Sequence, residues 1–134
     1  MLVVLDCNVL VSAGLTDGTC RSVLYEVVGY HRCVLSEEIV EEYREVTARP
    51  KFASLEPIYS QLISLLETVS MYVDSAASSF SLPDSDDEMY LSAAIVAVAD
   101  VLVTGNKAHF PEEQYENTSI VTPRQFLERV SRDR

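Results

Sequence analysis

Apolar residues occur along this chain in two patterns, short unbroken runs and longer stretches with helical spacing. Short runs rich in valine, leucine and isoleucine are typical of strands that are buried on both faces of a sheet. The strands predicted in this way are residues 2–5, 33–35, 71–73, 101–104 and 119–121. Apolar positions separated by three or four residues predict helices instead. The predicted helices are residues 21–29, 37–48, 55–69, 85–99 and 123–130.

Several predicted helices carry recognisable start and stop residues. Ser36 is a favourable N-terminal cap for the second helix, and Arg49-Pro50 ends that helix. Pro123 suits the first position of the last helix, where a missing N–H costs nothing. Residues 74–84 are polar and rich in serine, so we expect a flexible connection there.

The alternation of strands and helices predicts an α/β fold whose parallel sheet is covered on both faces. Residues 1–134 contain no internal repeat and no domain break, so we expect a single domain. Between the first strand and the first predicted helix, Asp6-Cys7-Asn8 ends the strand and Gly14 with residues 16–19 indicates a loop. Parallel sheets of this kind bind ligands beyond the carboxyl ends of their strands.

Composition narrows the class of protein. Apolar residues make up 48% and charged residues 23% of the chain, as in soluble globular proteins, and no apolar run approaches the length of a membrane span. The first strand reaches a carboxylate at Asp6 and has no basic start, so it is not a signal peptide and the expected location is the cytoplasm. Cys7, Cys20 and Cys33 lack metal-binding spacing, which favours reduced, buried thiols over a zinc site completed by a histidine.

The formal net charge of −11 argues against nonspecific binding to nucleic acid, because phosphate contacts normally come from Lys and Arg. Many of the acids lie in two local runs, residues 37–45 and 84–88. A cation bound between these runs would cancel part of their charge. Even so, we expect weak RNA binding unless a second subunit or a partner supplies basic surface.

Acid and amide side chains recur at the positions where such a fold places ligands. They end a strand, begin a helix or flank a buried helical stripe, and they are Asp6, Glu42, Asp87 and Asn106. Oxygen ligands of this kind suit Mg²⁺ or Mn²⁺. A divalent ion in turn suits phosphodiester hydrolysis, because it can activate water and stabilise charge on the phosphate. The sequence therefore predicts a small metal-dependent nuclease.

Each acid also has a structural explanation. Glu42 flanks the apolar stripe of its helix, so it can lean over the edge of the sheet, although a solvated glutamate beside Arg44 or Arg49 is the alternative. Asp6 follows a buried strand, where an unpaired carboxylate is costly, but it could simply be a turn residue.

Asp84 and Asp87 can both be explained by helix capping and by the helix dipole. Crowding Asp86, Asp87 and Glu88 together is nevertheless unfavourable without a nearby cation, which favours metal involvement, with Asp87 ahead of Asp86.

Further polar residues could support the predicted site. Asn8, Ser36 and Thr104 are expected to orient carboxylates or water. Lys107 and His109 are either exposed loop residues or contacts to a phosphate. We find no nucleophile motif, no dinucleotide fingerprint and no phosphate-binding loop in the sequence, so covalent catalysis and nucleotide cofactors are not supported.

The order of these motifs resembles that of PIN-domain proteins, in particular the toxin components of toxin–antitoxin systems. The resemblance covers nearly the whole chain, and its motifs are Leu5-Asp6-Cys7-Asn8-Val9-Leu10, Leu35-Ser36, Glu42-Tyr43, Arg49-Pro50-Lys51-Phe52, Asp84 to Asp87, Leu102-Val103-Thr104-Gly105-Asn106, Lys107, His109-Phe110-Pro111 and Thr122-Pro123. Each motif alone is weak, but their occurrence in this order is fairly specific.

The resemblance implies a three-layer α/β/α sandwich with a central parallel sheet and a ribonuclease that depends on Mg²⁺ or Mn²⁺. The family's acids fall on Asp6, Glu42 and Asp87, which would hold the metal. A fourth acid falls on Asn106, where an amide would weaken one metal position or act through water. Single-stranded RNA is the expected substrate, a cognate antitoxin the expected partner and a homodimer the expected assembly.

Two other classes remain open. A catalytically weak PIN-like domain could act as a protein- or RNA-binding module, which the negative charge and Asn106 favour. A phosphotransfer receiver or a phosphatase also places an aspartate after a strand, as Asp6 is placed here, but we see no clear catalytic lysine after a later strand.

Overall fold

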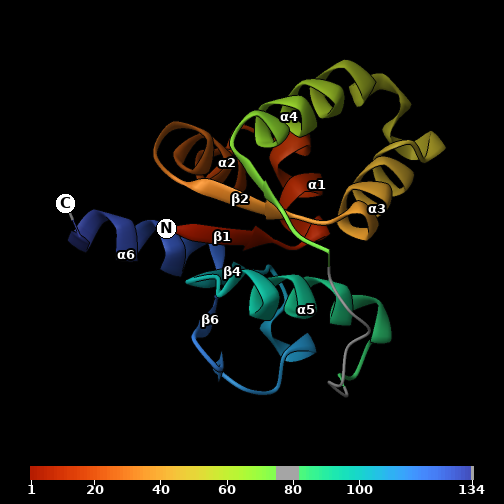
Figure 1. The fold of residues 1–134 in the computed structure, drawn as a ribbon. Coiled ribbons are helices and arrows are strands. Elements are labelled where there is room, and N and C mark those ends of the chain that lie inside the picture. The colour runs from red at the N-terminus through yellow and green to blue at the C-terminus, as the bar shows by residue number, and fades with distance from the viewer. Residues whose placement is uncertain (75–81, 134) are drawn as a thin grey trace.

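The five predicted strands are all present in a six-stranded sheet with the order β3-β2-β1-β4-β6-β5. The computed structural model describes residues 1–74 and 82–133 (Figure 1). The strands are β1 (Leu2–Leu5), β2 (Arg32–Leu35), β3 (Ser70–Tyr72), β4 (Val101–Val103), β5 (Gln114–Tyr115) and β6 (Thr118–Val121). All pairs along the sheet are parallel except β5 with β6, which is antiparallel. The predicted parallel sheet is therefore confirmed, with one short antiparallel edge strand added.

Helices cover both faces of the sheet and give the three-layer α/β/α arrangement. The α-helices are α1 (Cys7–Leu15), α2 (Thr19–Tyr30), α3 (Glu37–Thr47), α4 (Glu56–Thr68), α5 (Glu88–Ala97) and α6 (Pro123–Asp133), and the 3₁₀ helices are η1 (Pro50–Leu55), η2 (Ser85–Asp87) and η3 (Lys107–His109). Helix α5 contacts β1, β2 and β4, whereas α1, α2 and α4 contact one another, and α2 also contacts α6. Helix α3 contacts α1, α4 and α5, so it lies beside the end of the sheet (Figure 1).

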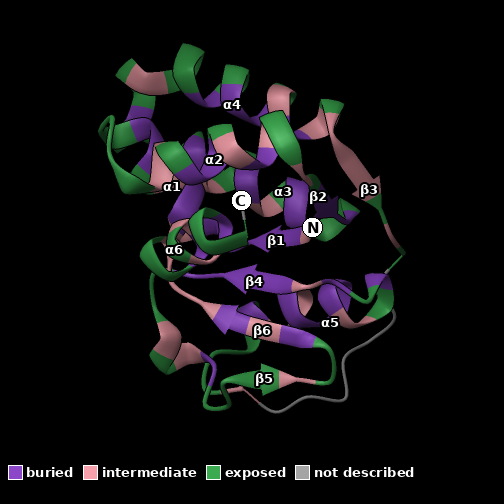
Figure 2. Cartoon of the chain, turned by 90° about the vertical axis from the view of Figure 1, so that its left-hand side faces the viewer, coloured by how far each residue is buried: buried purple, intermediate pink, exposed green. Residues whose placement is uncertain are grey.

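The order of the strands creates a topological switch point at the two central strands, β1 and β4. The chain moves outward from β1 to β2 and β3, then returns to β4 on the other side of β1 and continues to β6. The switch point is therefore the gap between the carboxyl ends of β1 and β4, where Leu5 pairs with Val103. Burial is highest in the strands and on the helix surfaces that face them (Figure 2).

The loop predicted between the first strand and residue 21 is wrong for most of its length. Residues 7–15 form α1, which begins directly after Asp6. Most of this helix is apolar and packed between other helices, with Val9, Leu10 and Ala13 fully buried. A helix that is apolar on nearly every side has no polar stripe, so its sequence lacks the alternation that identifies a surface helix.

Smaller differences concern helix ends and one connection. The predicted helix 85–99 begins as η2 and ends at Ala97, where Val98 adopts a left-handed conformation with φ of 54°. The expected flexible connection lies mainly in residues 75–81, outside the described part of the chain. None of the helices in residues 1–74 and 82–133 combines the length and the apolar character needed to cross a membrane.

Helices α1 and α4 meet at a point where only glycine fits. The ring of Tyr59 packs against Gly14, and a Cβ atom added to that glycine would overlap the ring. The Tyr59 hydroxyl donates a hydrogen bond to the Val11 carbonyl oxygen at 2.7 Å, and its ring contacts Phe52 edge-on. The tyrosine is therefore held on two sides and has little freedom to move away.

Candidate active site

Asp6 lies at the switch point and is tied to the neighbouring strand. It is 4% exposed, and its backbone N–H donates to the Val103 carbonyl oxygen at 2.9 Å. Its Oδ2 atom accepts hydrogen bonds from Thr104 Oγ1 at 2.8 Å and from Asn8 Nδ2 at 3.2 Å. The predicted roles of Thr104 and Asn8 beside this carboxylate therefore match their contacts in the structure.

Asn8 also joins the two segments that follow β1 and β4. Its Oδ1 atom accepts the Gly105 backbone N–H at 2.9 Å, while its Nδ2 atom contacts Asp6. A Cβ atom at Gly105 would lie 3.2 Å from Asn8 Oδ1, closer than ordinary packing allows. The absence of a side chain at this glycine thus permits the close approach of the two segments.

Glu42 lies at the margin of the buried face of α3, as the helical spacing predicts. It projects from α3, is partly buried, and accepts a hydrogen bond from the hydroxyl of Tyr90 on α5. Tyr90 is itself fully buried, and its ring stacks on that of Tyr43. The sequence interpretation did not single out Tyr90, although a tyrosine inside a buried helix needs a partner for its hydroxyl.

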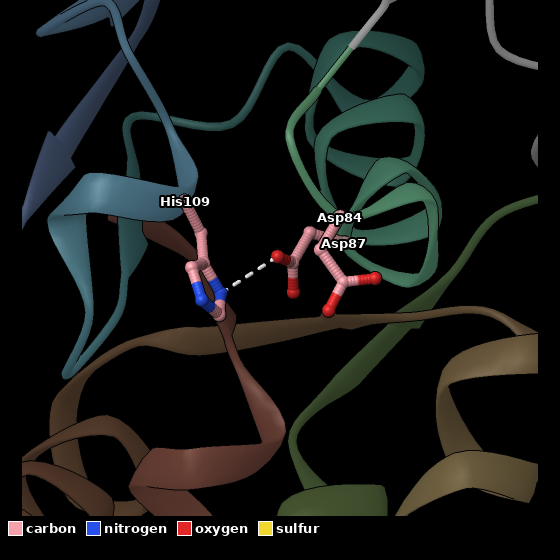
Figure 3. A group of neighbouring side chains, drawn as sticks. All are labelled: Asp84, Asp87 and His109. Atoms are coloured by element: carbon pink, nitrogen blue, oxygen red, sulfur yellow. Dashed lines mark ion pairs between the residues drawn. The ribbon is translucent and has the colours of Figure 1, made fainter.

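Asp84, Asp87 and His109 form a compact group of possible metal ligands. One donor atom from each lies within 4.8 Å of the other two, and among the described residues this is the one set of three His, Cys, Asp or Glu side chains to do so (Figure 3). The two carboxylates come from the start of the helical segment that leads into α5, and the imidazole comes from η3. Asp6 and Glu42 are therefore neighbours of this group and not members of it.

Asp87 combines deep burial with an incomplete set of contacts. The residue is 7% exposed, and its Oδ2 atom lies 2.8 Å from His109 Nδ1. That ion pair lacks hydrogen-bond geometry, so Oδ2 has no hydrogen-bond partner among the described residues. A buried carboxylate oxygen in this state is unfavourable unless a cation lies nearby.

Burial raises the pKa of all three predicted metal-binding carboxyls. It raises the pKa of Asp6 against the opposing Thr104 hydrogen bond, and it raises the pKa of Glu42 against the opposing Tyr90 hydrogen bond. Burial and then the charge of Asp6 raise the pKa of Asp87 to about 6. The Asp6 charge also raises the pKa of Glu42. These three acids therefore destabilise one another's charged forms, and a divalent cation would relieve the repulsion.

The remaining predicted residues have other contacts. The Ser36 hydroxyl accepts the Ile39 backbone N–H at 3.3 Å, which confirms it as a helix cap. Asp84 caps η2 by accepting the Asp86 backbone N–H at 3.0 Å. Lys107 Nζ donates to Gln125 Oε1 at 3.4 Å, so this lysine contacts α6.

Asn106 differs most from its predicted use as an oxygen ligand. Its side-chain nitrogen lies 2.9 Å from His109 Nε2, and its backbone N–H donates to Thr104 Oγ1 at 3.1 Å. His109, which was expected to be an exposed loop residue or a phosphate contact, therefore lies between Asn106 and Asp87.

Two grooves of opposite character lie beside the site. One, of about 480 Å³, is lined mainly by acids, which are Glu38, Glu41, Glu42, Glu45 and Asp86. The other, of about 560 Å³, runs along α6 and the β5–β6 edge, and its cationic residues are Lys107, Arg129 and Arg132, with Glu113 and Glu128 also in its lining. Lys107, which lines the second groove, directly follows Asn106 in the sequence.

The raised carboxyl pKa values predict an unusual pH dependence of stability in metal-free protein. The pKa of Asp87 rises from 3.8 to about 6, so the folded protein holds this proton more tightly than the unfolded chain does. The contribution of this carboxyl to the free energy of unfolding is then complete below about pH 4 and is lost as the pH rises through 6. The test is urea unfolding with a chelator present, for the parent and for Asp87→Asn. In the variant, the loss of unfolding free energy between pH 4 and pH 7 is expected to be smaller by roughly 1–2 kcal/mol. A parent protein that becomes steadily more stable from pH 4 to 7 would contradict the expectation.

Comparisons with known proteins agree with this architecture. A model of the PIN-domain family matches residues 2–108. The fold is similar to a chain in the crystal structure of VapBC2 from Rickettsia felis bound to a DNA fragment from their promoter. That match has a TM-score of 0.59 and 17% sequence identity, and it covers 91% of this chain and 98% of the other. Comparison with curated protein sequences gave no match.

The matched segment extends from the start of β1 to η3. It includes every side chain described above at the carboxyl edge, from Asp6 to Asn106, apart from His109, which lies one residue beyond it. The chain belongs to the PIN-domain family.

Proposed function

We propose that this protein is a metal-dependent endoribonuclease and the toxin of a toxin–antitoxin pair. The observation that carries the proposal is the concentration of buried or partly buried carboxylates at the sheet's switch point. Asp6 and Asp87 are less than a tenth exposed, and one oxygen of Asp87 lacks a hydrogen-bond partner among the described side chains and backbone groups. Such an arrangement is stable in its charged form only with a cation.

The donor set fits Mg²⁺ or Mn²⁺. In this proposal Asp6, Glu42 and Asp87 hold the ion, because the charge of Asp6 acts on both other carboxyls and that of Glu42 acts on Asp87. Mg²⁺ and Mn²⁺ both accept carboxylate oxygens, and the unsatisfied oxygen of Asp87 gives such an ion a place to bind.

The surrounding residues position these acids for hydrolysis of a phosphodiester. Thr104 and Asn8 hold Oδ2 of Asp6, which leaves its other oxygen directed away from these two contacts. Tyr90 fixes the carboxylate of Glu42. When bound, a divalent ion would supply charge stabilisation at the phosphate and activation of the attacking water. The chain's own contribution is to orient the acids and hold them close together, and the bound cation would favour their ionised forms.

Single-stranded RNA is the substrate that we propose, since an extended strand can enter a site at a sheet edge more readily than a stiff duplex. The family membership supports nuclease chemistry, and the likeness to a chain of the VapBC2 structure supports the toxin role. A cognate antitoxin, a homodimeric assembly and a cytoplasmic location belong to the same proposal.

A cleavage assay with metal removal tests the enzymatic part. The purified protein, incubated with a labelled mixed-sequence single-stranded RNA, is expected to cleave it with Mn²⁺ or Mg²⁺ present. Excess EDTA should reduce cleavage to the background of a protein-free sample, and added Mn²⁺ should restore it. Cleavage that is indifferent to EDTA would contradict a metal-dependent mechanism and indicate a contaminating ribonuclease.

A binding module is the second candidate, and two observations favour it. The position of the family's fourth acid is Asn106, whose side chain contacts His109, and the net charge of −11 opposes tight RNA binding. Metal binding by calorimetry with no cleavage of varied RNAs would select the binding module over the nuclease.

A further inference from the structure

The group formed by Asp84, Asp87 and His109 offers donors of two chemical kinds. Its ligand atoms all lie within 4.8 Å of one another, a limit close to the roughly 4.0–4.4 Å between two ligands on opposite sides of an ion that each approach to about 2.0–2.2 Å. Figure 3 shows the two carboxylates close together at the start of the α5 segment, with one of them paired to the imidazole. Mg²⁺ takes oxygen ligands almost exclusively, whereas an imidazole nitrogen suits transition metals.

A second observation points to a ligand at this group. Asp87 is 7% exposed, and its Oδ2 atom, directed toward the imidazole, has no hydrogen-bond partner in the described parts of the chain. The neighbouring ion pair with His109 Nδ1, at 2.8 Å, does not satisfy this oxygen in hydrogen-bond geometry. A cation shared by the oxygen and the nitrogen would satisfy both atoms at once.

The far side of the imidazole is held in the way expected of a metal ligand. Asn106 contacts His109 Nε2 at 2.9 Å, and its own backbone N–H donates to Thr104 Oγ1. For Nδ1 to offer its lone pair, the proton must sit on Nε2 and be donated to an acceptor. A half-turn of the Asn106 amide, which exchanges nitrogen for oxygen in the same place, provides that acceptor.

We propose that Asp84, Asp87 and His109 form a transition-metal site in which the imidazole makes the protein prefer Mn²⁺ to Mg²⁺, with Asn106 as the positioning residue. The inference deepens the proposed function and rests on it for the biological use of the ion. In this proposal the Asn106 amide orients the imidazole of His109, and the imidazole supplies a metal ligand. The pair thus takes the place of the fourth acid that the family resemblance assigns to position 106.

Calorimetric titration of the full chain with MnCl₂ and with MgCl₂ tests the preference. His109→Gln is expected to raise the Kd for Mn²⁺ at least about tenfold and to change the Kd for Mg²⁺ less than about twofold. Asp84→Asn should raise the Kd for both Mn²⁺ and Mg²⁺. Glu112→Gln, at an exposed acid just beyond η3, is the matched control and should change neither.

Nuclear magnetic resonance adds a readout that does not depend on catalysis. The chain has two histidines, and the His31 ring contacts the amino group of Met1 at the opposite end of β1 from Asp6. Substoichiometric Mn²⁺ is expected to broaden the ring signals of His109 and leave those of His31 sharp. Asn106→Ala should reduce the Mn²⁺ preference, and Asn106→Asp, which keeps an acceptor for Nε2–H, should retain it.

The outcomes separate this inference from the proposed nuclease. Equal losses of Mn²⁺ and Mg²⁺ affinity in His109→Gln, unchanged affinity for both, or no measurable Mn²⁺ binding by the parent would each overturn the imidazole site. RNA cleavage that survives such a result would leave the nuclease proposal in place. Confirmed Mn²⁺ selectivity without any cleavage would instead support the metal site and reject the nuclease.

Discussion

Asp6→Asn is expected to reduce metal-dependent RNA cleavage at least about a hundredfold while the protein stays folded. Loss of a residue that only orients a metal ligand commonly costs 10–100-fold, and Asp6 is proposed as a ligand itself. Asparagine keeps the size of the side chain and can still contact Thr104, whose hydroxyl donates to Asp6 at 2.8 Å. The measurement is the initial rate of RNA cleavage with Mn²⁺, alongside circular dichroism of both proteins.

Asp17→Asn is the matched control for this experiment. Asp17 is exposed in the segment between α1 and α2, so the same chemical change there should leave the cleavage rate within about twofold of the parent. Equal rates for the parent and Asp6→Asn would rule out the proposed site. If the activity of both variants fell together, the cause would be the loss of negative charge and not the loss of a ligand.

Gly14→Ala is expected to destabilise the protein by about 1–3 kcal/mol through overpacking. The new methyl group would overlap the ring of Tyr59, which cannot easily move because its hydroxyl bonds to Val11 and its ring contacts Phe52. The backbone of Gly14 is helical and has no positive φ, so alanine would otherwise be favoured. Urea unfolding followed by circular dichroism measures the difference.

The same substitution at Gly29 is expected to have the opposite effect on stability. Gly29 also lies in a helix, α2, but nothing within 4 Å would meet its added Cβ atom. Alanine there should stabilise the protein by about 0.5–1 kcal/mol, because it restricts the unfolded chain and favours the helix. If both variants proved equally stable, the contact between α1 and α4 would not be as rigid as the structure indicates.

Five of the six strands were predictable from sequence because each contains an apolar run, whereas β5, a Gln-Tyr pair, does not. Leu2–Leu5 and Val101–Val103 are buried on both faces, and their β-branched residues leave little ambiguity. Helix α1 was missed because its apolar residues surround the helix instead of forming a stripe, and because Gly14 looked like a loop residue. In the structure that glycine is required by the Tyr59 ring, a contact 45 positions away that local pattern cannot reveal.

The positions of the candidate carboxylates in the fold were predictable from sequence, and their contacts were not. Helical periodicity correctly placed Glu42 at the edge of the buried stripe, and the rule for parallel sheets placed Asp6 beside β4. The ion pair between His109 and Asp87 joins residues that are 22 positions apart in the sequence. No periodic pattern in the sequence links these two positions. Such a contact depends on how η3 folds back toward α5, which is set by tertiary packing and not by local sequence.

Of the two grooves, the one along α6 offers a polyanion the more favourable approach. Phosphates arriving over α3 would pass the wall of glutamates that flanks Glu42, whereas phosphates arriving along α6 would meet Lys107, Arg129 and Arg132. On the proposed function, an RNA strand would thus be guided across the C-terminal helix before reaching Asp6. A protein of strongly negative net charge can in this way present a nucleic acid with one groove that contains cations and another that is mainly acidic.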